Sequence, residues 1–269
     1  MFRFTWVFLA LLMLTGCFYG TVYKNSDRLA LNQLEKYVAL TDDQQAWFLK
    51  EFGQVQVIHQ SRYLPTYQEW LSVLKNGWKD MDEQQLYELS MRVNAHWYEL
   101  IESLEPASIK FLMSLDNSQK AQLIDSIKEK MQLRQNDVDR QARALTRFED
   151  ILGSLDKKQK DMIARHVDKT AFYQEIRALN NQNRLAAIES LLAQKQLGEA
   201  DIIKLGRYVV NHPRYWPEHR IEKRERRIRD QIKFMLRLRE TLSNNQQEEL
   251  AHYFDELSDL LVVLKNTKL

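Results

Sequence analysis

The residues best suited to bind a ligand through charge lie between Arg220 and Arg239. This segment carries nine basic and three acidic side chains. At about 100° per residue, its apolar residues share one helix face, and seven basic residues spread over the other. This predicted basic face consists of Arg220, Lys223, Arg226, Arg227, Arg229, Lys233 and Arg237. It suits anionic lipid headgroups, lipopolysaccharide phosphates or an acidic protein partner.

The same charges also have a purely structural interpretation. Glu222 and Arg226, like Glu225 and Arg229, are spaced four residues apart and would pair along a solvated helix. Each such pair contributes only about 0.2–0.5 kcal/mol. A solvated face is the commoner use of a charge run, so we prefer this interpretation from the sequence alone.

Other residues capable of chemistry do not form a recognisable site. The spacing of His212, Glu218 and His219 fits no metal centre, since metal ligands come in tight sets. His59 and Arg62, beside two tyrosines, are typical of a buried polar contact rather than of catalysis. Metalloprotease, nucleophile-elbow and phosphate-loop patterns are absent from the sequence. We therefore expect no enzyme activity, no metal and no cofactor.

The N-terminus has the build of a secretory signal. Arg3 supplies positive charge, residues 4–14 are mostly apolar, and small residues precede Cys17. Such a run is too short to span a bilayer as a mature helix, which needs about 20 residues. Cys17 is the only cysteine and has no disulfide partner in the chain. A free thiol is a liability in an oxidising compartment.

The four residues Leu14, Thr15, Gly16 and Cys17 resemble the lipobox of bacterial lipoproteins. The resemblance implies cleavage before Cys17 and acylation, including palmitate-type chains, that anchors the protein in a lipid bilayer. Phe18 in place of aspartate implies sorting to the outer membrane. The alternatives are a plain cleaved signal or an uncleaved anchor. We expect a signal peptide over residues 1–16 and one lipid-anchored periplasmic domain over residues 17–269.

Composition narrows the protein classes and folds that remain possible. Removal of Arg3 with the signal leaves basic and acidic side chains almost equal in number, which argues against a nucleic-acid binder. After the signal, no apolar run is long enough to span a membrane. Only seven glycines and four prolines punctuate 269 residues, which favours helices over strands and turns.

Apolar periodicity predicts an all-α fold, an elongated bundle of antiparallel helices with one long central helix. The central helix is predicted over residues 117–153, about 50 Å long, and ends at Gly153. Pro65 is expected to break or restart the chain between two earlier helices. The other expected helices cover residues 22–38, 44–61, 66–75, 83–104, 106–113, 157–167, 171–192, 200–210, 218–242 and 246–264.

One short pattern recurs at five expected helix starts. An apolar residue is followed by Thr, Ser or Asp and, three residues later, by Gln. This pattern predicts a capping box, in which the first side chain accepts from the glutamine N–H and the glutamine side chain accepts from the cap N–H. The five pairs are Thr41 and Gln44, Asp82 and Gln85, Asp116 and Gln119, Asp156 and Gln159, and Ser243 and Gln246.

Two family resemblances follow from these motifs. The lipobox, the Tyr23-x-Asn25-x-Asp27 segment and the stretches Tyr37–Gln44 and His59–Tyr67 resemble an uncharacterised family of Gram-negative outer-membrane lipoproteins. That resemblance implies a location and a fold but no activity. The Leu40-Thr41-x-x-Gln44 form is also similar, more loosely, to the repeated signature of Spy/CpxP-type periplasmic stress proteins, which are helical and shield unfolded clients.

The sequence thus favours an outer-membrane lipoprotein at the periplasmic face that acts by binding or as a structural module of the envelope. Its expected partners are the bilayer, through acylated Cys17, and an envelope protein or anionic lipid. The alternative function is a Spy/CpxP-like chaperone or envelope-stress module. A chaperone would suppress aggregation of an unfolded protein, whereas a scaffold would co-purify with a defined partner.

Overall fold

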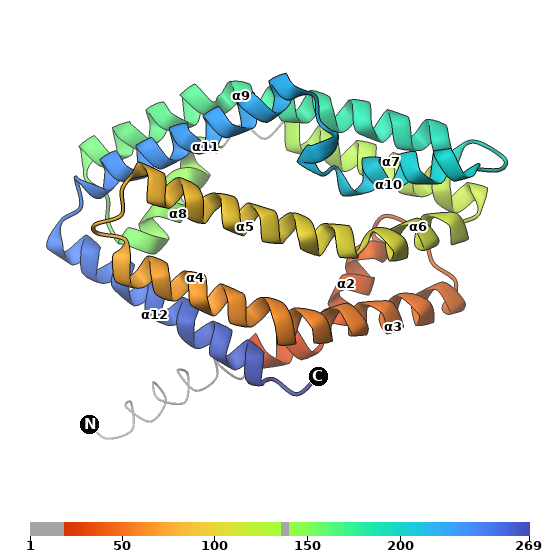
Figure 1. Ribbon diagram of the computed structural model, residues 1–269, viewed down its shortest axis with the longest axis horizontal. Coiled ribbons are helices and arrows are strands. Elements are labelled where there is room, and N and C mark those ends of the chain that lie inside the picture. The colour runs from red at the N-terminus through yellow and green to blue at the C-terminus, as the bar shows by residue number, and fades with distance from the viewer. Residues whose placement is uncertain (1–18, 136–139) are drawn as a thin grey trace. The chain divides into compact units, whose positions relative to one another are not determined.

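The computed structural model describes residues 19–135 and 140–269, which are helical except for short connections (Figure 1). No strand occurs in these two ranges, so the predicted all-α fold is confirmed. Of the helices described, none is long and apolar enough to cross a membrane. The signal segment and the lipobox residues Leu14 to Cys17 lie outside the described residues.

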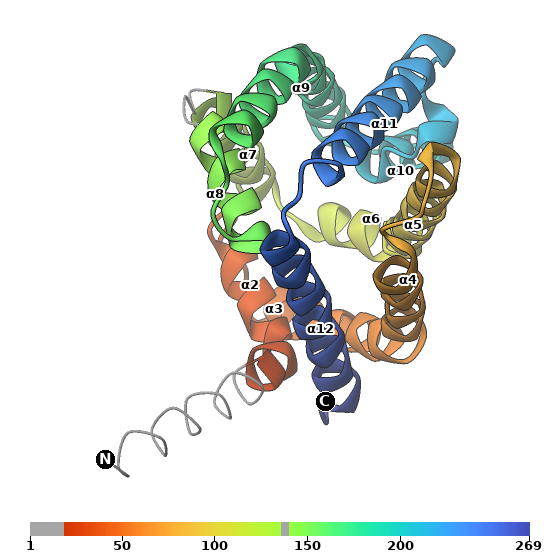
Figure 2. The same ribbon diagram turned by 90° about the vertical axis from the view of Figure 1, so that its left-hand side faces the viewer.

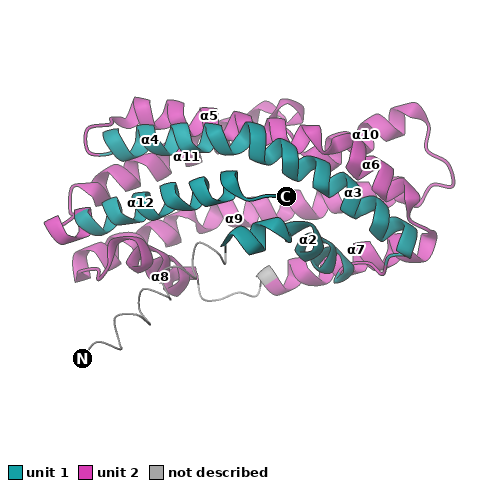
Figure 3. Cartoon of the chain, turned by 90° about the horizontal axis from the view of Figure 1, so that it is seen from below, with its two compact units in different colours: residues 1–36, 40–78, 248–269 teal, residues 37–39, 79–247 magenta. Residues whose placement is uncertain are grey.

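The described chain divides into two compact units (Figure 3). Unit 1 holds residues 19–36, 40–78 and 248–269, and unit 2 holds residues 37–39, 79–135 and 140–247. Unit 1 contains α2 (Ser26–Glu35), α3 (Asp42–Ile58), η1 (His59–Tyr63), α4 (Leu64–Gly77) and most of α12 (Asn244–Asn266). Unit 2 contains α5 (Glu83–Ser103), α6 (Glu105–Ser114), α7 (Asn117–Gln135), α8 (Arg140–Leu152), α9 (Lys157–Leu192), α10 (Glu199–Val210), η2 (Pro213–Tyr215) and α11 (Glu218–Arg239).

In unit 1, α3 continues into α4 through the π-helical turn η1, although the sequence predicted a break at Pro65. Proline lacks an N–H, and within a regular α-helix its ring collides with the carbonyl four residues earlier. The wider π-turn relieves this conflict because the Leu64 N–H donates to the His59 carbonyl, five residues back. Pro65 then occupies the first turn of α4, where its missing N–H has no cost. The predicted break is therefore wrong.

Polar contacts join distant parts of the chain within unit 1. The Tyr23 hydroxyl lies 3.0 Å from Nδ1 of His59, and the Gln56 side chain donates to the Tyr23 carbonyl. Gln60 donates to the Leu264 carbonyl at 2.9 Å. The contact expected around His59 is thus present, and its hydroxyl partner is a tyrosine that the sequence did not indicate.

In unit 2, α9 is the helix against which α7, α8, α10 and α11 each pack, and α5 packs against α11 (Figures 1 and 2). At the C-terminal end of α9, Leu191 and Leu192 form a buried cluster with Leu205 of α10. Farther along, the buried ring of Phe234 stacks on His166 with ring centroids 4.0 Å apart, and meets Phe148 edge-on. These apolar contacts fix α8, α10 and α11 against α9.

The long helix predicted over residues 117–153 corresponds to α7 and α8, which both pack against α9, and residues 136–139 between them lie outside the described residues. Lys128 pairs with Glu189 at 2.8 Å, and Gln141 donates to Asp168 at 2.7 Å. Both contacts hold this stretch of the chain to α9.

The longest described helix is α9, with 36 residues, although the sequence predicted two helices there, over 157–167 and 171–192. Thr170 lies between the two predicted pieces. Its hydroxyl donates to the His166 carbonyl at 2.8 Å, so the side chain is satisfied without ending the helix. The predicted stop at Gly153 is confirmed, since this residue has a φ of 70°, which favours glycine.

All five predicted capping boxes are present. At the start of α9, the Gln159 N–H donates to the Asp156 carboxylate at 2.7 Å, and the Asp156 N–H donates to the Gln159 side-chain oxygen at 3.0 Å. The same reciprocal pair of hydrogen bonds opens α3, α5, α7 and α12. The recurring pattern therefore has a local structural use at every copy.

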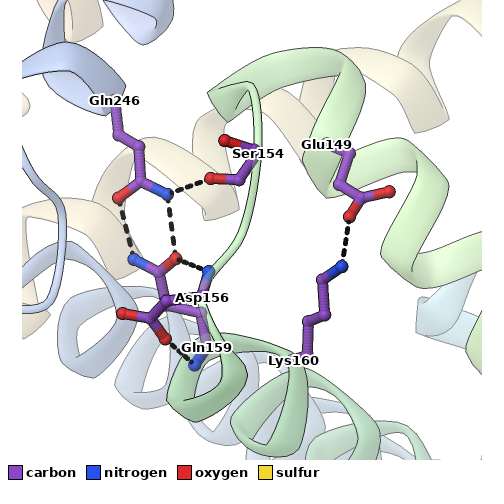
Figure 4. A network of polar contacts seen from close by, with 6 residues as sticks. All are labelled: Glu149, Ser154, Asp156, Gln159, Lys160 and Gln246. Atoms are coloured by element: carbon purple, nitrogen blue, oxygen red, sulfur yellow. Dashed lines mark hydrogen bonds and ion pairs between the residues drawn. The ribbon is translucent and has the colours of Figure 1, made fainter.

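Two of the capping glutamines also join their helix starts to each other (Figure 4). The side-chain amides of Gln159 and Gln246 donate to one another at 2.8 Å. Gln159 donates further to the Thr241 carbonyl at 3.1 Å, and Gln246 to the Ser154 carbonyl at 2.9 Å. Both side chains are buried. We call this arrangement the glutamine corner, and sequence analysis anticipated only its capping half.

Candidate anion-binding site

Five arginines line the facing sides of α9 and α11 in unit 2. Arg177 and Arg184 come from α9 and are seven residues apart, which places them on the same helix face. Arg220, Arg224 and Arg227 come from α11, where spacings of four and three residues have the same effect. We call these five residues the arginine row. All except Arg177 are partly buried.

The guanidinium groups of the row are close enough to repel one another. Burial lowers the pKa of Arg227, and the charges of Arg177 and Arg224 lower it further. Burial likewise lowers the pKa of Arg184, with a second contribution from Arg177. Burial also lowers the pKa of Arg220, and the charge of Arg184 lowers it further. The folded protein therefore concentrates positive charge here at a cost in free energy.

The neighbours of the row position these arginines without neutralising them. Arg184 donates to the Tyr208 carbonyl at 3.4 Å, and the Arg220 guanidinium lies 3.6 Å from the Trp216 ring centroid. Arg224 lies over the ring of Tyr98. Within the part of the chain that the structure describes, no member of the row forms an ion pair with a carboxylate. The described contacts of the row are thus with neutral groups.

A cavity of about 330 Å³ lies between α5, α9 and α11, beside the row. Arg227 and Gln231 of α11, with Tyr173 and Gln174 of α9, contribute to its wall. The Tyr173 hydroxyl donates to Asp230 at 3.3 Å, so this nearby carboxylate already has a partner. The cavity therefore offers guanidinium, amide and hydroxyl groups, a set that suits an anionic polar ligand.

A larger cavity of about 530 Å³ lies between α7, α8 and α9. Arg140, Arg143 and Arg147 of α8 and Arg177 of α9 line it. It shares Thr170 and Gln174 with the smaller cavity, so the two are neighbours across α9. None of the described side chains lining either cavity is acidic.

The basic face predicted for α11 does not stay together as one surface. Arg220 and Arg227 belong to the arginine row, whereas Arg229 and Lys233 lie 3.8 and 3.7 Å from Glu83 of α5. The exposed members are Lys223, Arg226, Lys233 and Arg237. The predicted pairs Glu222–Arg226 and Glu225–Arg229 are not among the ion pairs of the described residues, and Arg229 lies near Glu83 of α5 instead.

Sequence analysis missed most of the site. Arg224 was left out of the predicted face, and the arginines of α8 and α9 were not singled out. A signal was present, since Arg140, Arg143 and Arg147 follow the i, i+3, i+7 spacing of one helix face. The apolar periodicity that predicts a helix in this stretch does not by itself reveal that stripe.

The remaining candidate residues lie elsewhere. His212 is 3.8 Å from Glu102 and meets the Tyr98 ring edge-on, while Glu218 and His219 are exposed. Within residues 19–135 and 140–269, no group of three or more His, Cys, Asp or Glu side chains is placed to hold a metal ion. Arg62 lies over the ring of Tyr63 in unit 1.

Comparison with known proteins places the chain in a family. No curated protein and no solved structure matches it. The sequence model of a family of unknown function, DUF6279, matches residues 36–219, about two thirds of the chain. The match includes α8 and α9, with their arginines, and ends at the first turn of α11. The chain therefore belongs to the family of unknown function DUF6279.

Proposed function

We propose that this protein is an outer-membrane lipoprotein, anchored through acylated Cys17, that binds an anionic ligand of the cell envelope. The observation that carries the binding proposal is the arginine row, whose described partners are rings, carbonyls and an amide rather than carboxylates. Guanidinium groups recognise phosphates and carboxylates through paired hydrogen bonds. A ligand that brings negative charge would relieve the mutual repulsion of the row.

The chemistry of the row supports binding rather than acid–base catalysis. Arginine keeps its proton at any physiological pH, so it holds a charged ligand but does not exchange protons with it. Its neighbours Tyr98, Trp216 and Asn211 fix the orientation of the guanidinium groups. A site with pre-positioned donors loses less side-chain freedom when the ligand arrives.

The chaperone-like alternative gains no support from the recurring Leu-Thr-x-x-Gln form. All five copies serve as capping boxes, and two of them also build the glutamine corner. A pattern with this structural use does not by itself indicate client binding. Suppression of aggregation of an unfolded protein remains the assay that would favour the chaperone alternative.

The binding proposal is tested by the thermal stability of the full chain in non-ionic detergent, with and without inorganic pyrophosphate at constant ionic strength. A ligand that binds only the folded state raises the midpoint of unfolding. We expect this rise in the natural protein and its loss in the double variant Arg224→Gln/Arg227→Gln. The matched control is Lys223→Gln/Arg226→Gln, which removes two exposed charges from the same helix.

The control should respond to pyrophosphate like the natural protein. An equal rise in all three proteins would contradict a site at the arginine row. Loss of the response in the control alone would assign binding to the exposed side of α11 instead.

The anchor is tested separately by the substitution Cys17→Ser. We expect loss of radioactive palmitate labelling and release of the protein from the membrane fraction. Retention of both would contradict the lipoprotein proposal and leave the binding proposal untouched.

A further inference from the structure

Unit 1 brings the first described residues of the chain against the end of α12. A Cβ added to Gly20 would lie 3.2 Å from the hydroxyl oxygen of Thr267 and 3.6 Å from a methyl group of Val263. Figures 1 and 2 show the end of α12 beside the start of the described chain. We call residues 19–24 together with residues 260–269 the anchor-proximal end of unit 1.

The anchor-proximal end exposes apolar and aromatic side chains. Tyr19, Val22, Val262 and Leu269 each leave between 36 and 48% of their surface accessible to solvent. Isolated exposed apolar side chains are common on proteins, but four of them on two segments in contact form a candidate interaction surface. A tyrosine ring, with an apolar body and a polar hydroxyl, suits the interface between a membrane and water.

The charged residues of α12 are divided along its length. Residues 248–259 carry five acidic side chains, all exposed, and no lysine or arginine. Residues 260–269 carry the exposed Lys265 and Lys268 and no acidic side chain. Residues 19–24 likewise carry the exposed Lys24 and no acidic side chain. Positive charge therefore accompanies the exposed apolar side chains, and negative charge lies farther back along α12.

A lipid bilayer is the partner that matches this surface. Tyr19 follows Cys17 by two residues, and two residues of fully extended chain span at most about 7 Å. Acyl chains on Cys17 would therefore hold the anchor-proximal end within that distance of the bilayer surface. Lysines near an anionic membrane surface are attracted to its headgroups, whereas the carboxylates of residues 248–259 are repelled by them.

We infer that the anchor-proximal end of unit 1 rests on the surface of an anionic bilayer. Its exposed apolar side chains enter the headgroup region, and its lysines lie near the lipid phosphates. The acidic stretch of α12 stays off the lipid surface. This orientation of unit 1 rests on the proposed anchor at Cys17 and is independent of the arginine row.

The test places one fluorescent label at a time on the full acylated chain in vesicles. Cys17 is the only cysteine, and acylation makes its thiol unavailable, so an added cysteine takes up a thiol-reactive label alone. Val262→Cys and Leu269→Cys carry the label at the anchor-proximal end. The matched control Glu248→Cys is exposed on nearly the same side of α12, 14 residues before Val262 and about 21 Å away along the helix.

Vesicles of phosphatidylethanolamine and phosphatidylglycerol should shield the first two labels. We expect the labels at Val262 and Leu269 to lose most of their quenching by acrylamide in the water, and to be quenched by lipids with a nitroxide on the headgroup. The label at Glu248 should stay accessible to acrylamide and escape the nitroxide. Folded variants in which all three labels behave alike, whether all accessible or all shielded, overturn the inference.

The part played by charge is tested in the Val262→Cys protein. Adding Lys265→Glu/Lys268→Glu should restore much of the acrylamide quenching in the same vesicles, because the anionic headgroups then repel this end. The matched control Lys265→Arg/Lys268→Arg keeps both charges and should leave the shielding unchanged. Shielding that survives the charge reversal overturns the attraction to anionic headgroups.

The natural protein distinguishes failure of the anchor from failure of the orientation. Labelling of the natural protein at Cys17 would show a free thiol and contradict the anchor, and the orientation with it. If the natural protein takes up no label but the labels at Val262 and Glu248 are equally accessible, the anchor stands and the orientation is wrong. Neither outcome bears on pyrophosphate binding at the arginine row.

Discussion

Two polar clusters of unit 2 differ in how completely their groups are paired. In the glutamine corner, the side-chain amides of Gln159 and Gln246 bond to each other, to two carbonyls and to their own helix starts. In the arginine row, like charges lie near one another, and their described partners are neutral. The corner is closed within the chain, whereas the row is where we propose that an added anion binds.

The contrast separates polar groups that stabilise the fold from charged groups whose burial destabilises it. Buried polar groups stabilise a structure when every donor and acceptor is satisfied. Charges that lose water without gaining an opposite charge destabilise it. Side chains retained under the second condition are candidates for function, because folding alone does not explain them.

The largest expected effect is at the centre of the closed cluster. Gln159→Ala removes one of the two side-chain amides of the corner, so the Asp156 N–H and the Thr241 carbonyl lose these hydrogen bonds and the Gln246 amide loses its bonds to Gln159. We expect the free energy of unfolding to fall by about 3 kcal/mol, measured by urea denaturation. The matched control is Gln85→Ala, whose side chain is exposed and makes the capping bond. A similar loss of about 1 kcal/mol or less in both variants would contradict a special role for the corner.

A smaller effect isolates the capping half of the same cluster. Asp156→Ala removes the carboxylate that accepts from the Gln159 N–H but keeps the pairing of the two glutamines. Loss of a helix cap typically costs about 1 kcal/mol. Asp156→Asn keeps an accepting oxygen and should restore most of that stability. If Asp156→Ala proves as damaging as Gln159→Ala, the amide pairing contributes little of its own.

The difference between the clusters also explains what the sequence reveals. Capping boxes are local, because residue type and a spacing of three residues suffice to predict them, and all five are confirmed. The pairing of Gln159 with Gln246 joins residues 87 positions apart, and no local pattern specifies it. The same limit applies to the site, since the α11 spacing suggested charge but not that Arg220 and Arg227 face α9.

Two errors in the predicted helices have physical causes of the same kind. Pro65 normally ends a helix, but a π-turn upstream absorbs its missing hydrogen bond. Residues 157–192 form the single helix α9 where two helices are predicted, since the Thr170 hydroxyl is satisfied by the His166 carbonyl and α9 packs against α7, α8, α10 and α11. Local propensity predicted that these segments are helical and did not predict where tertiary contacts join them.

The contact between Tyr23 and His59 in unit 1 can be compared with these two clusters through the change in protein stability at high pH. Burial, with a second contribution from Tyr67, raises the pKa of Tyr23 to about 12. Below pH 10, the ordinary value, the hydroxyl is protonated in both states and its stabilising effect is complete. Between pH 10 and about 12, Tyr23 ionises in the unfolded chain but stays protonated in the folded protein. The free energy of unfolding therefore falls as pH rises.

Tyr23→Phe should therefore flatten the fall in stability between pH 10 and 12, measured by urea denaturation at a series of pH values. At neutral pH the variant should lose about 1 kcal/mol with the hydroxyl contact to His59. Tyr19→Phe, at a tyrosine that is about half exposed, serves as the control. An unchanged alkaline slope in Tyr23→Phe would mean that this hydroxyl is not held in its protonated form by the fold.

We expect the smallest change in stability for a substitution in the arginine row. A small change would distinguish the row from the glutamine corner. Arg227→Gln removes a partly buried charge that lies near Arg177 and Arg224. Because the charge is disfavoured in the folded state, we expect the free energy of unfolding to stay within about 0.5 kcal/mol of the natural value or to rise. Inorganic pyrophosphate should raise the unfolding midpoint of the natural protein and have much less effect on the variant. A loss as large as that of Gln159→Ala would instead place Arg227 among the groups that the fold needs, because a guanidinium held for an external anion contributes to the complex and not to the empty protein.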